Sequence, residues 1–308
     1  MELTCTSQRD ARLLSILRRE LALSSGLVKR LKYRGAFTVN GEVAHTDHPV
    51  KIGDTVRVRL DEDTPDYPAE DGELHILYED EALIAVDKPA GMLVHPSFSR
   101  NTGTLANRLL GYYQKTGQPC AVHPVSRLDR DTFGIVLLAK NAHIHAKLCA
   151  MSKSGAIEKT YRALVFGCPP APEGVIDAPI ARVSETSLLR CIREDGKPAR
   201  SRYRVIDSSD TASLLELRPV TGRTHQLRLH CKAAGFPILG DPQYCSPASA
   251  LYSGTHGLFC QQLLAARLEL THPVMGQPLV ISSRQSVSAG DEQVHADARV
   301  LDGNVRAV

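Results

Sequence analysis

The chain has 308 residues, of which 43% are hydrophobic, and its formal net charge is only +3. This length suits one large domain or two smaller ones with a substantial core, and the small net charge means that affinity for an anionic partner must come from local patches. We expect neither a signal peptide nor a membrane span, because no charged N-terminal segment leads into an apolar stretch and no apolar run is long enough to cross a bilayer. The eight cysteines form no C-x-x-C pair and have no zinc-type spacing, so we expect reduced thiols, a cytoplasmic protein and no metal site.

Two short helices are predicted near the N-terminus. Arg12, Leu13, Leu14, Leu17 and Leu21 follow helical spacing, with the leucines expected on one face. A second helix is predicted over 26–33, where the Ser24-Ser25 pair provides an N-cap and Gly35 ends the helix.

Strands follow these helices. The segment 37–43 is predicted to be a hairpin with Asn40-Gly41 as its turn. The segment 50–59 ends in alternation, which places Val56 and Val58 inward and their arginine neighbours outward.

Residues 1–60 form a basic unit, with eleven Lys and Arg against six Asp and Glu. This unit resembles the alpha-L RNA-binding module first recognised in a ribosomal small-subunit protein, through residues 27–34, Val39-Asn40-Gly41 and 52–56. The resemblance implies that the second helix contacts RNA through Lys29, Arg30, Lys32 and Arg34. The alternative is an accessory domain whose basic face is merely solvated.

An acidic stretch separates this unit from the rest of the chain. Residues 61–73 contain seven acidic residues, two prolines and no Lys or Arg, which predicts a semi-extended linker. The remainder, 74–308, carries 26 basic and 21 acidic residues, so both units are basic and the linker masks this in the total.

The large unit is predicted to be an α+β domain with a mainly antiparallel sheet, because its strands and helices do not alternate as βαβ units. We expect helices over 104–113, 141–153 and 224–234, the last with Thr224 as its cap, and strands over 74–78, 83–87, 135–139, 159–166, 201–206, 213–219, 262–270 and 279–282. The domain is expected to end at residue 283, and 284–308 to form a tail.

The most informative segment is 123–134, which places Asp129 among cations immediately before an apolar strand. Arg127 and Arg130 are expected to favour the ionised form of Asp129 and keep it available as a nucleophile. The alternative is a solvated loop in which the arginines simply pair with Asp129 and Asp131.

Three further segments accompany this one: 80–96 with Lys88-Pro-Ala-Gly91, 158–165 with Tyr161, and 220–230 with Thr224-His-Gln-Leu-Arg228, followed by 236–244. In this order and spacing the set resembles the RluA-type pseudouridine synthases over about residues 74–283. The resemblance implies the sheet type of that family and an isomerase that converts uridine in RNA to pseudouridine without a cofactor.

The resemblance also implies the site. Asp129 is the essential carboxylate, which acts on the ribose by attack, by charge stabilisation or by deprotonation. Tyr161 is the active-site tyrosine, which stacks on the base and serves in proton removal, and Arg228 pairs with Asp129. Arg127 is expected to occupy the space of an extruded base, and Lys88 to contact a phosphate. Thr224, His225 and Gln226 are expected to be structural, and Gly240-Asp241 to shape the pocket edge.

Three positions depart from the family pattern: Ser126 replaces a His, Phe133 a Ser and Leu264 a His. Two other functions are open: a non-catalytic RNA-binding or ribosome-assembly factor, and a glycosidase, which would need a second carboxylate such as Asp131. The expected partner is structured RNA, with ribosomal RNA favoured and transfer RNA as the alternative, bound by a monomer.

Overall fold

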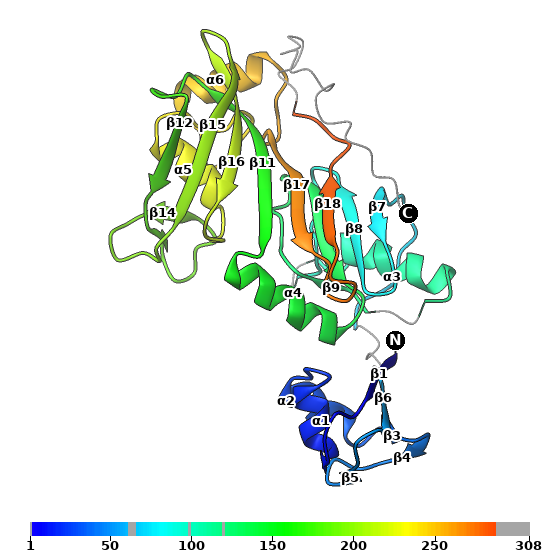
Figure 1. Ribbon diagram of the computed structural model, residues 1–308. Coiled ribbons are helices and arrows are strands. Elements are labelled where there is room, and N and C mark those ends of the chain that lie inside the picture. Colours follow the sequence, from blue (N-terminus) through cyan, green and yellow to red (C-terminus); the bar gives the residue numbers. More distant parts are fainter. Residues whose placement is uncertain (1, 61–65, 98–99, 119–120, 288–308) are drawn as a thin grey trace.

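The structure is a computed structural model that describes residues 2–60, 66–97, 100–118 and 121–287 (Figure 1). Residues 2–60 have a sheet and a hydrophobic core of their own, and the rest of the described chain is built on one larger sheet. Over the described ranges, no helix is both long and apolar enough to cross a membrane.

The N-terminal unit combines two short helices with a small antiparallel sheet, in which the strand order is β1-β6-β3-β4. Its elements are β1 (Glu2–Thr6), β2 (Ala11–Arg12), α1 (Leu13–Arg19), α2 (Ser25–Leu31), β3 (Phe37–Val39), β4 (Glu42–Val43), β5 (Pro49–Val50) and β6 (Thr55–Arg59). The strand β1 has no counterpart in the sequence prediction, although its five residues alternate between exposed and half-buried positions.

The local signals in this unit are confirmed where they depend on turn and cap chemistry. The Ser24 hydroxyl accepts the Leu27 N–H at 3.2 Å and so caps α2. Asn40 and Gly41 adopt φ values of 53° and 90°, which joins β3 to β4 through a tight hairpin turn. One expectation is wrong: Leu14 is 42% exposed, because the short α1 buries Leu13, Ile16 and Leu17 instead.

The large unit is an α+β domain, as predicted, and in its described residues ten strands form one sheet. The order β12-β15-β16-β11-β17-β10-β8-β7 defines the main path, with β18 beside β17 and β9 beside β10. The strands are β7 (Ile76–Glu79), β8 (Leu83–Lys88), β9 (His123–Pro124), β10 (Phe133–Ala139), β11 (Ile157–Phe166), β12 (Glu173–Asp177), β15 (Arg200–Ser208), β16 (Ala212–Pro219), β17 (Leu263–Thr271) and β18 (Pro278–Ser282).

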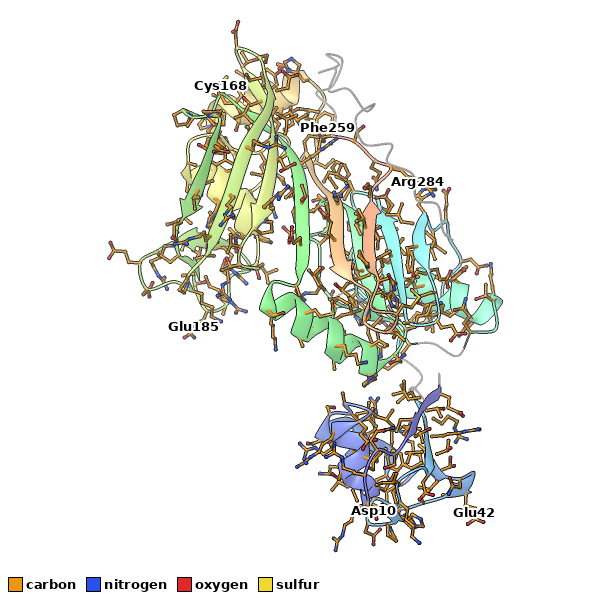
Figure 2. All side chains as sticks on the ribbon, in the orientation of Figure 1. Asp10, Glu42, Cys168, Glu185, Phe259 and Arg284 are labelled. Carbon is orange, nitrogen blue, oxygen red and sulfur yellow. The ribbon has the colours of Figure 1, made fainter. Side chains whose placement is uncertain are left out.

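The described part of this unit contains four helices: α3 (Leu105–Lys115), α4 (Ala142–Ser154), α5 (Gln226–Ala233) and α6 (Pro247–Thr255). A separate hairpin of β13 (Ile180–Arg182) and β14 (Arg190–Ile192) leaves the sheet between β12 and β15, and its loop carries Glu185 outward (Figure 2). The hairpin and α6 were not predicted from the sequence, since both lack a sustained hydrophobic period.

The central strands are buried on both faces, which explains their continuous apolar runs. On β10, Val136 and Leu138 pack in the cluster that contains α3, whereas Ile135 and Leu137 pack in the cluster that contains α4. Successive side chains of a strand point to opposite faces, so α3 and α4 cover opposite faces of β8 and β10.

All strand pairs of this sheet are antiparallel except that of β10 with β17, which is joined only through Phe133↔Leu264 and Gly134↔Ala265. Gly134 has a φ of +100°, and a β-carbon there would collide with the Ala265 carbonyl. Beyond this point β17 pairs with β18 instead. The two strands therefore diverge next to the loop that precedes β10.

The acidic stretch differs from the predicted free linker. Residues 61–65 lie outside the described part of the chain, but Tyr67 is buried in the cluster with α3. The Asn107 side chain donates to the Pro68 carbonyl at 2.8 Å, and the Glu70 N–H donates to the Asn107 carbonyl at 3.0 Å. The boundary of the large unit therefore lies before residue 67, not at residue 74.

The C-terminal boundary also differs from the expected one. The carboxylate of Asp87, on β8, accepts hydrogen bonds from the Ser283 hydroxyl at 2.7 Å, the Arg284 N–H at 2.8 Å and the Gln285 side chain at 2.7 Å. The ordered domain therefore extends through Gln285, and residues 288–308 of the expected tail lie outside the described residues.

Candidate active site

The loop that carries Asp129 is fixed at three points before it enters β10. Leu128 is buried in the core cluster beside Ala265. The Lys88 ammonium donates to the Arg130 carbonyl at 2.9 Å, and the Gln261 side chain donates to the Thr132 hydroxyl. Lys88 ends β8, whereas Gln261 and Ala265 lie just before and within β17, so segments far apart in the sequence fix the position of Asp129.

Lys88 does not match its expected role as a phosphate contact. Its side chain is fully buried, and besides the Arg130 carbonyl its ammonium donates to the carbonyls of Pro89 and Met92. Burial lowers the pKa of Lys88 to about 8, although the charges of Asp131 and Asp129 oppose this. An ammonium with three carbonyl acceptors has no donor left for RNA, so Lys88 supports the loop.

Helix α5 presents Arg228 to this loop. The helix begins at Gln226 after His225, which has a φ of 57°, so the expected Thr224 cap is wrong. The buried Gln226 amide instead organises the turn, since it accepts from the Arg223 N–H and donates to the Arg200 carbonyl. The structural role predicted for Gln226 agrees with these bonds.

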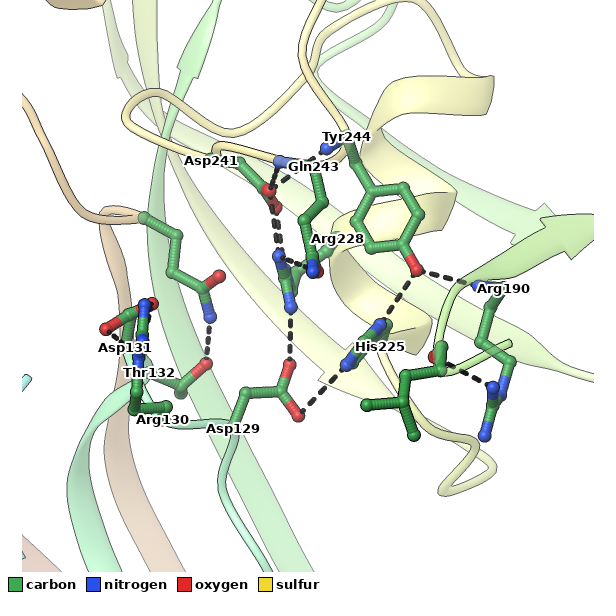
Figure 3. A network of polar contacts seen from close by, with 12 residues as sticks. Asp129, Arg130, Asp131, Thr132, Arg190, His225, Arg228, Asp241, Gln243 and Tyr244 are labelled. Atoms are coloured by element: carbon green, nitrogen blue, oxygen red, sulfur yellow. Dashed lines mark hydrogen bonds and ion pairs between the residues drawn. The ribbon is translucent and has the colours of Figure 1, made fainter. Parts of the chain in front are cut away.

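Arg228 connects two carboxylates (Figure 3). Its Nη1 donates to Asp129 Oδ2 at 3.1 Å, and its Nε and Nη2 donate to Asp241 Oδ2 and Oδ1 at 2.7 and 2.8 Å. A further bond from Nη2 reaches Gln243 Oε1 at 2.9 Å. The planar guanidinium is thus held by a bidentate pair with Asp241 and directs its remaining edge at Asp129.

The two carboxylates differ in exposure. The Asp241 side chain is completely buried, whereas that of Asp129 is 27% exposed. Burial alone would raise the pKa of Asp241, but the hydrogen bond and charge of Arg228 and the N–H groups of Gln243 and Tyr244 lower it. Asp241 is therefore a fixed counterion, and Asp129 is the carboxylate that a ligand can reach.

Arg127 and Arg130, the arginines of the loop that carries Asp129, have different surroundings. Arg130 forms a two-point ion pair with Asp131, at 3.0 Å from Nε to Oδ1 and 2.9 Å from Nη2 to Oδ2. Arg127 is exposed on the same loop. The cation bonded to Asp129 is Arg228, as the family resemblance implied. The Arg130–Asp131 pair agrees in part with the alternative in which the loop arginines pair with the neighbouring carboxylates.

Tyr161 lies on β11, opposite Ala265 of β17, and packs against the same cluster as Leu128. A register shift between Thr160 and Tyr161 interrupts the regular pairing at this point. Burial raises the pKa of Tyr161 to about 12, and the negative charge of Asp129 adds to the effect. The phenol is therefore protonated at neutral pH, which suits stacking and hydrogen-bond donation more than proton removal.

Two residues in this site, His225 and Tyr244, were not given a catalytic part by the sequence reasoning. His225 Nε2 is 3.8 Å from Asp129 Oδ1, and its Nδ1 is 2.8 Å from the Tyr244 hydroxyl (Figure 3). The Tyr244 ring also lies under the Arg228 guanidinium, at 4.9 Å. Asp241 was expected to shape the pocket edge, but it is fully buried as the partner of Arg228.

The basic residues in and just after α2 lie in the N-terminal unit, and most of them are exposed. The helix buries Leu27, Val28 and Leu31, while Lys29, Lys32 and Arg34 are exposed and Arg30 is half-buried. The Lys32 ammonium lies 5.6 Å from the centre of the Tyr33 ring, which is itself 82% exposed.

Comparison with known proteins identifies the family. The profile described as RNA pseudouridylate synthase matches residues 82–233. The chain is 33% identical to a Bacillus subtilis (strain 168) protein named RNA pseudouridine synthase YhcT, over 91% of this chain and 92% of the relative. It is 37% identical to a Nitrosomonas europaea protein named ribosomal large subunit pseudouridine synthase D, over 80% of this chain and 72% of the relative.

The fold agrees with this relation. The solved structure of human RNA pseudouridylate synthase domain containing 1 covers 72% of this chain and 93% of its own, with a TM-score of 0.56 and 24% identity. In this chain, the segment with Asp129 and the segment with Arg228 meet beside the middle of a mainly antiparallel sheet. The chain belongs to the RNA pseudouridylate synthase family, in its RluA-type branch.

Proposed function

We propose that this protein converts specific uridines of ribosomal RNA to pseudouridine, with Asp129 as the carboxylate that acts on the ribose. The observation that carries the proposal is the Arg228 bridge, which orients the accessible Asp129 against the buried Asp241. A protein that only bound RNA would have no need for an accessible carboxylate held in this way.

The reaction needs few groups. The bond from ribose to the base nitrogen breaks, the detached uracil turns, and a bond from ribose to carbon 5 forms. Carbon 5 then loses its proton and the freed nitrogen gains one, so the product is an isomer of the starting nucleoside. The sugar gains positive charge when the first bond breaks, and a fixed carboxylate nearby stabilises that charge. Attack on the anomeric carbon, charge stabilisation and deprotonation of the ribose all use Asp129, and no step requires a cofactor.

Tyr161 and Arg127 complete the proposed site. A protonated Tyr161 offers a ring for stacking on the uracil and a hydroxyl for hydrogen bonding to it. Arg127 is exposed on the loop that carries Asp129, so it is placed to fill the stack from which the target base is extruded.

Ribosomal RNA is proposed as the substrate because relatives that match most of this chain are named ribosomal large subunit pseudouridine synthase D. The exposed Lys29, Lys32 and Arg34, in and just after α2, supply positive charge for contact with a structured RNA, and Arg57 and Arg59 add to it. The seven cysteines in the described ranges are free thiols, which supports a cytoplasmic setting. We infer that the enzyme works there as a monomer.

The test replaces Asp129 with Asn, which keeps the shape and removes the negative charge. We expect no pseudouridine in an unmodified transcript of bacterial large-subunit ribosomal RNA, with RNA affinity retained within about threefold, because phosphate contacts dominate affinity. Asp131→Asn, on the same loop, is the control and should keep most of the activity. Near-normal modification by the Asp129→Asn protein would contradict the assignment, and a wild-type protein that binds but never modifies RNA would favour a pure RNA-binding role.

A further inference from the structure

The two oxygens of the Asp129 carboxylate face different partners. Oδ2 accepts the Arg228 hydrogen bond at 3.1 Å, whereas Oδ1 lies 3.8 Å from His225 Nε2. The second distance is too long for a hydrogen bond, but catalytic contacts often tighten only when the substrate is bound. The orientation of Oδ1 therefore depends on what holds the imidazole.

The imidazole of His225 is held from behind by Tyr244. The Tyr244 hydroxyl oxygen accepts the backbone N–H of Arg190, on β14, at 3.0 Å and lies 2.8 Å from His225 Nδ1. Because that oxygen already accepts one hydrogen, its own hydrogen is free to be donated to Nδ1. This arrangement places the imidazole hydrogen on Nε2, where it faces Asp129; the other tautomer would aim a lone pair at a carboxylate.

The backbone at His225 adds an independent indication. His225 has a φ of 57°, in the left-handed region that residues other than glycine seldom occupy. Such a conformation persists only where surrounding contacts enforce it, and these positions cluster at functional sites. Here the conformation places the ring between the Tyr244 hydroxyl and the Asp129 carboxylate (Figure 3).

Burial favours the neutral form of the ring. Burial lowers the pKa of His225 below its usual value; Asp129 and Asp241 oppose this, and Arg228 and Arg190 support it. A neutral ring can donate a single hydrogen to Asp129 once the distance from Nε2 to Oδ1 shortens, without forming a full ion pair. The carboxylate therefore keeps its negative charge available to the sugar.

We propose that His225 is a positioning residue of the synthase, in which the Tyr244 hydroxyl fixes the neutral Nε2–H tautomer and that N–H orients Asp129 Oδ1 toward the ribose. This inference rests on the proposed role of Asp129. It makes Tyr244 a common support for both partners of the carboxylate, since its ring contacts Arg228 and its hydroxyl contacts His225. It also links the hairpin of β13 and β14 to the site through the Arg190 N–H.

Tyr244→Phe tests the hydroxyl alone, because the ring beneath Arg228 is kept. We expect the single-turnover rate at saturating RNA, measured on the same ribosomal transcript, to fall about tenfold to a hundredfold, with RNA affinity nearly unchanged. The melting temperature should fall only modestly, because the Arg190 N–H loses its acceptor. Tyr252→Phe is the matched control, since Tyr252 on α6 stacks on His256 at 3.9 Å in a second tyrosine–histidine pair. A rate for Tyr244→Phe within twofold of wild type would overturn the proposal.

The pH profile separates positioning from a merely structural role. Protonation of His225 would bind Asp129 in an ion pair, so the wild-type rate should fall at acid pH, with a midpoint below about 6.5. Loss of the Tyr244 hydroxyl removes a bond to the neutral ring, which raises the pKa of His225 and moves this acid limb to higher pH. His225→Gln should lower the rate and abolish the limb. Unchanged acid limbs in both variants would contradict the role.

The tautomer is also measurable without activity. Nitrogen chemical shifts of His225 in the folded wild-type protein, assigned by comparison with His225→Gln, should show a hydrogen on Nε2 and an acceptor at Nδ1 at neutral pH. A hydrogen on Nδ1 would overturn the inference while leaving the Asp129 proposal intact. Conversely, an active Asp129→Asn enzyme would remove the proposed function while leaving the tautomer as found.

Discussion

Arg228 uses every edge of its guanidinium, and this explains why the residue is suited to orient the carboxylate that we propose for catalysis. Three nitrogens bond to Asp241, Gln243 and Asp129, and the Tyr244 ring lies against the guanidinium. Burial would lower the pKa of Arg228, but the bonds and charge of Asp241 and of Asp129 raise it. A lysine at this position would carry the charge without the planar fork and would not hold both carboxylates at once.

Replacement of Arg228 should therefore affect turnover and stability together. Arg228→Met leaves Asp241 buried without its cation, so we expect a loss of about 3–5 kcal/mol in the free energy of unfolding. We also expect the single-turnover rate to fall far more than RNA affinity. Denaturant unfolding and single-turnover kinetics on the same preparation measure the two effects.

The double variant Arg228→Met/Asp241→Asn separates these effects. An uncharged Asn keeps an oxygen for the Gln243 and Tyr244 N–H groups and removes the buried charge, so stability should largely return while turnover stays low. Recovery of turnover together with stability would mean that Arg228 serves only the fold. A loss of RNA affinity larger than the loss of rate would instead place Arg228 among the phosphate contacts.

At the scale of the elements, the sequence predicted what depends on local chemistry. The Ser24 cap, the Asn40-Gly41 turn and the apolar strand β10 were all found where expected. Pairing across the chain was less accessible: Arg130 is adjacent to Asp129 in sequence yet bonds Asp131, while Arg228 lies 99 residues away and bonds Asp129. Adjacent side chains diverge in a tight turn, so only the family resemblance supplied the correct partner.

Burial was the second quantity that the sequence could not supply. Lys88 was expected to contact a phosphate, yet three carbonyls hold its ammonium inside the fold. Similarly, the acidic composition of 61–73 concealed Tyr67, which packs beside α3. Composition averages over a segment, whereas a single side chain determines whether the segment is attached to the core.

Helix α4 contains a histidine that should make the fold sensitive to acid. His143 lies in the first turn of the helix and is 3% exposed, and its Nε2 has no hydrogen-bond partner among the described residues. Burial, with a smaller effect from Lys147, lowers the pKa of His143 to about 4. A positive charge there is further disfavoured because the helix N-terminus is itself positive.

The sign of the effect follows from the two pKa values. The unfolded chain binds the proton near pH 6.5 and the folded one near pH 4, so this stability is complete above 6.5 and is lost as pH falls toward 4. We expect His143→Leu to reduce the acid loss between these values by roughly 1–3 kcal/mol. Denaturant unfolding at several pH values measures this loss of stability. The control is His75→Leu, because the His75 side chain is 56% exposed. An equal acid loss in wild type and His143→Leu would contradict the prediction.

At the scale of the whole molecule, RNA affinity and chemistry are assigned to different units. The N-terminal unit has its own core and presents Lys29, Lys32 and Arg34 to solvent. The residues proposed for catalysis all belong to the larger sheet or to the loops and helix beside it. If the first unit contributes only phosphate contacts, its loss should change binding and its salt dependence, because each neutralised phosphate releases counterions.

Two truncations test this division, and the packing of residues 67–70 determines where they should be made. Removal of residues 1–65 keeps Tyr67, the Pro68 carbonyl and Glu70 on α3. This protein should stay folded and modify saturating RNA at the full rate. It should bind RNA about tenfold to a hundredfold more weakly, with a shallower salt slope, if two to four phosphate contacts are lost.

Removal of residues 1–73 should in addition destabilise the fold by roughly 2–5 kcal/mol. Without Tyr67 the apolar surface that it covers is exposed to water, and the buried Asn107 amide loses the Pro68 carbonyl as an acceptor. Single-turnover kinetics across RNA and salt concentrations, together with unfolding curves, distinguish the two proteins. A folded 66–308 protein without a saturated rate would show that the N-terminal unit belongs to the active site, and equal stability of the two truncations would show that residues 67–73 are a linker after all.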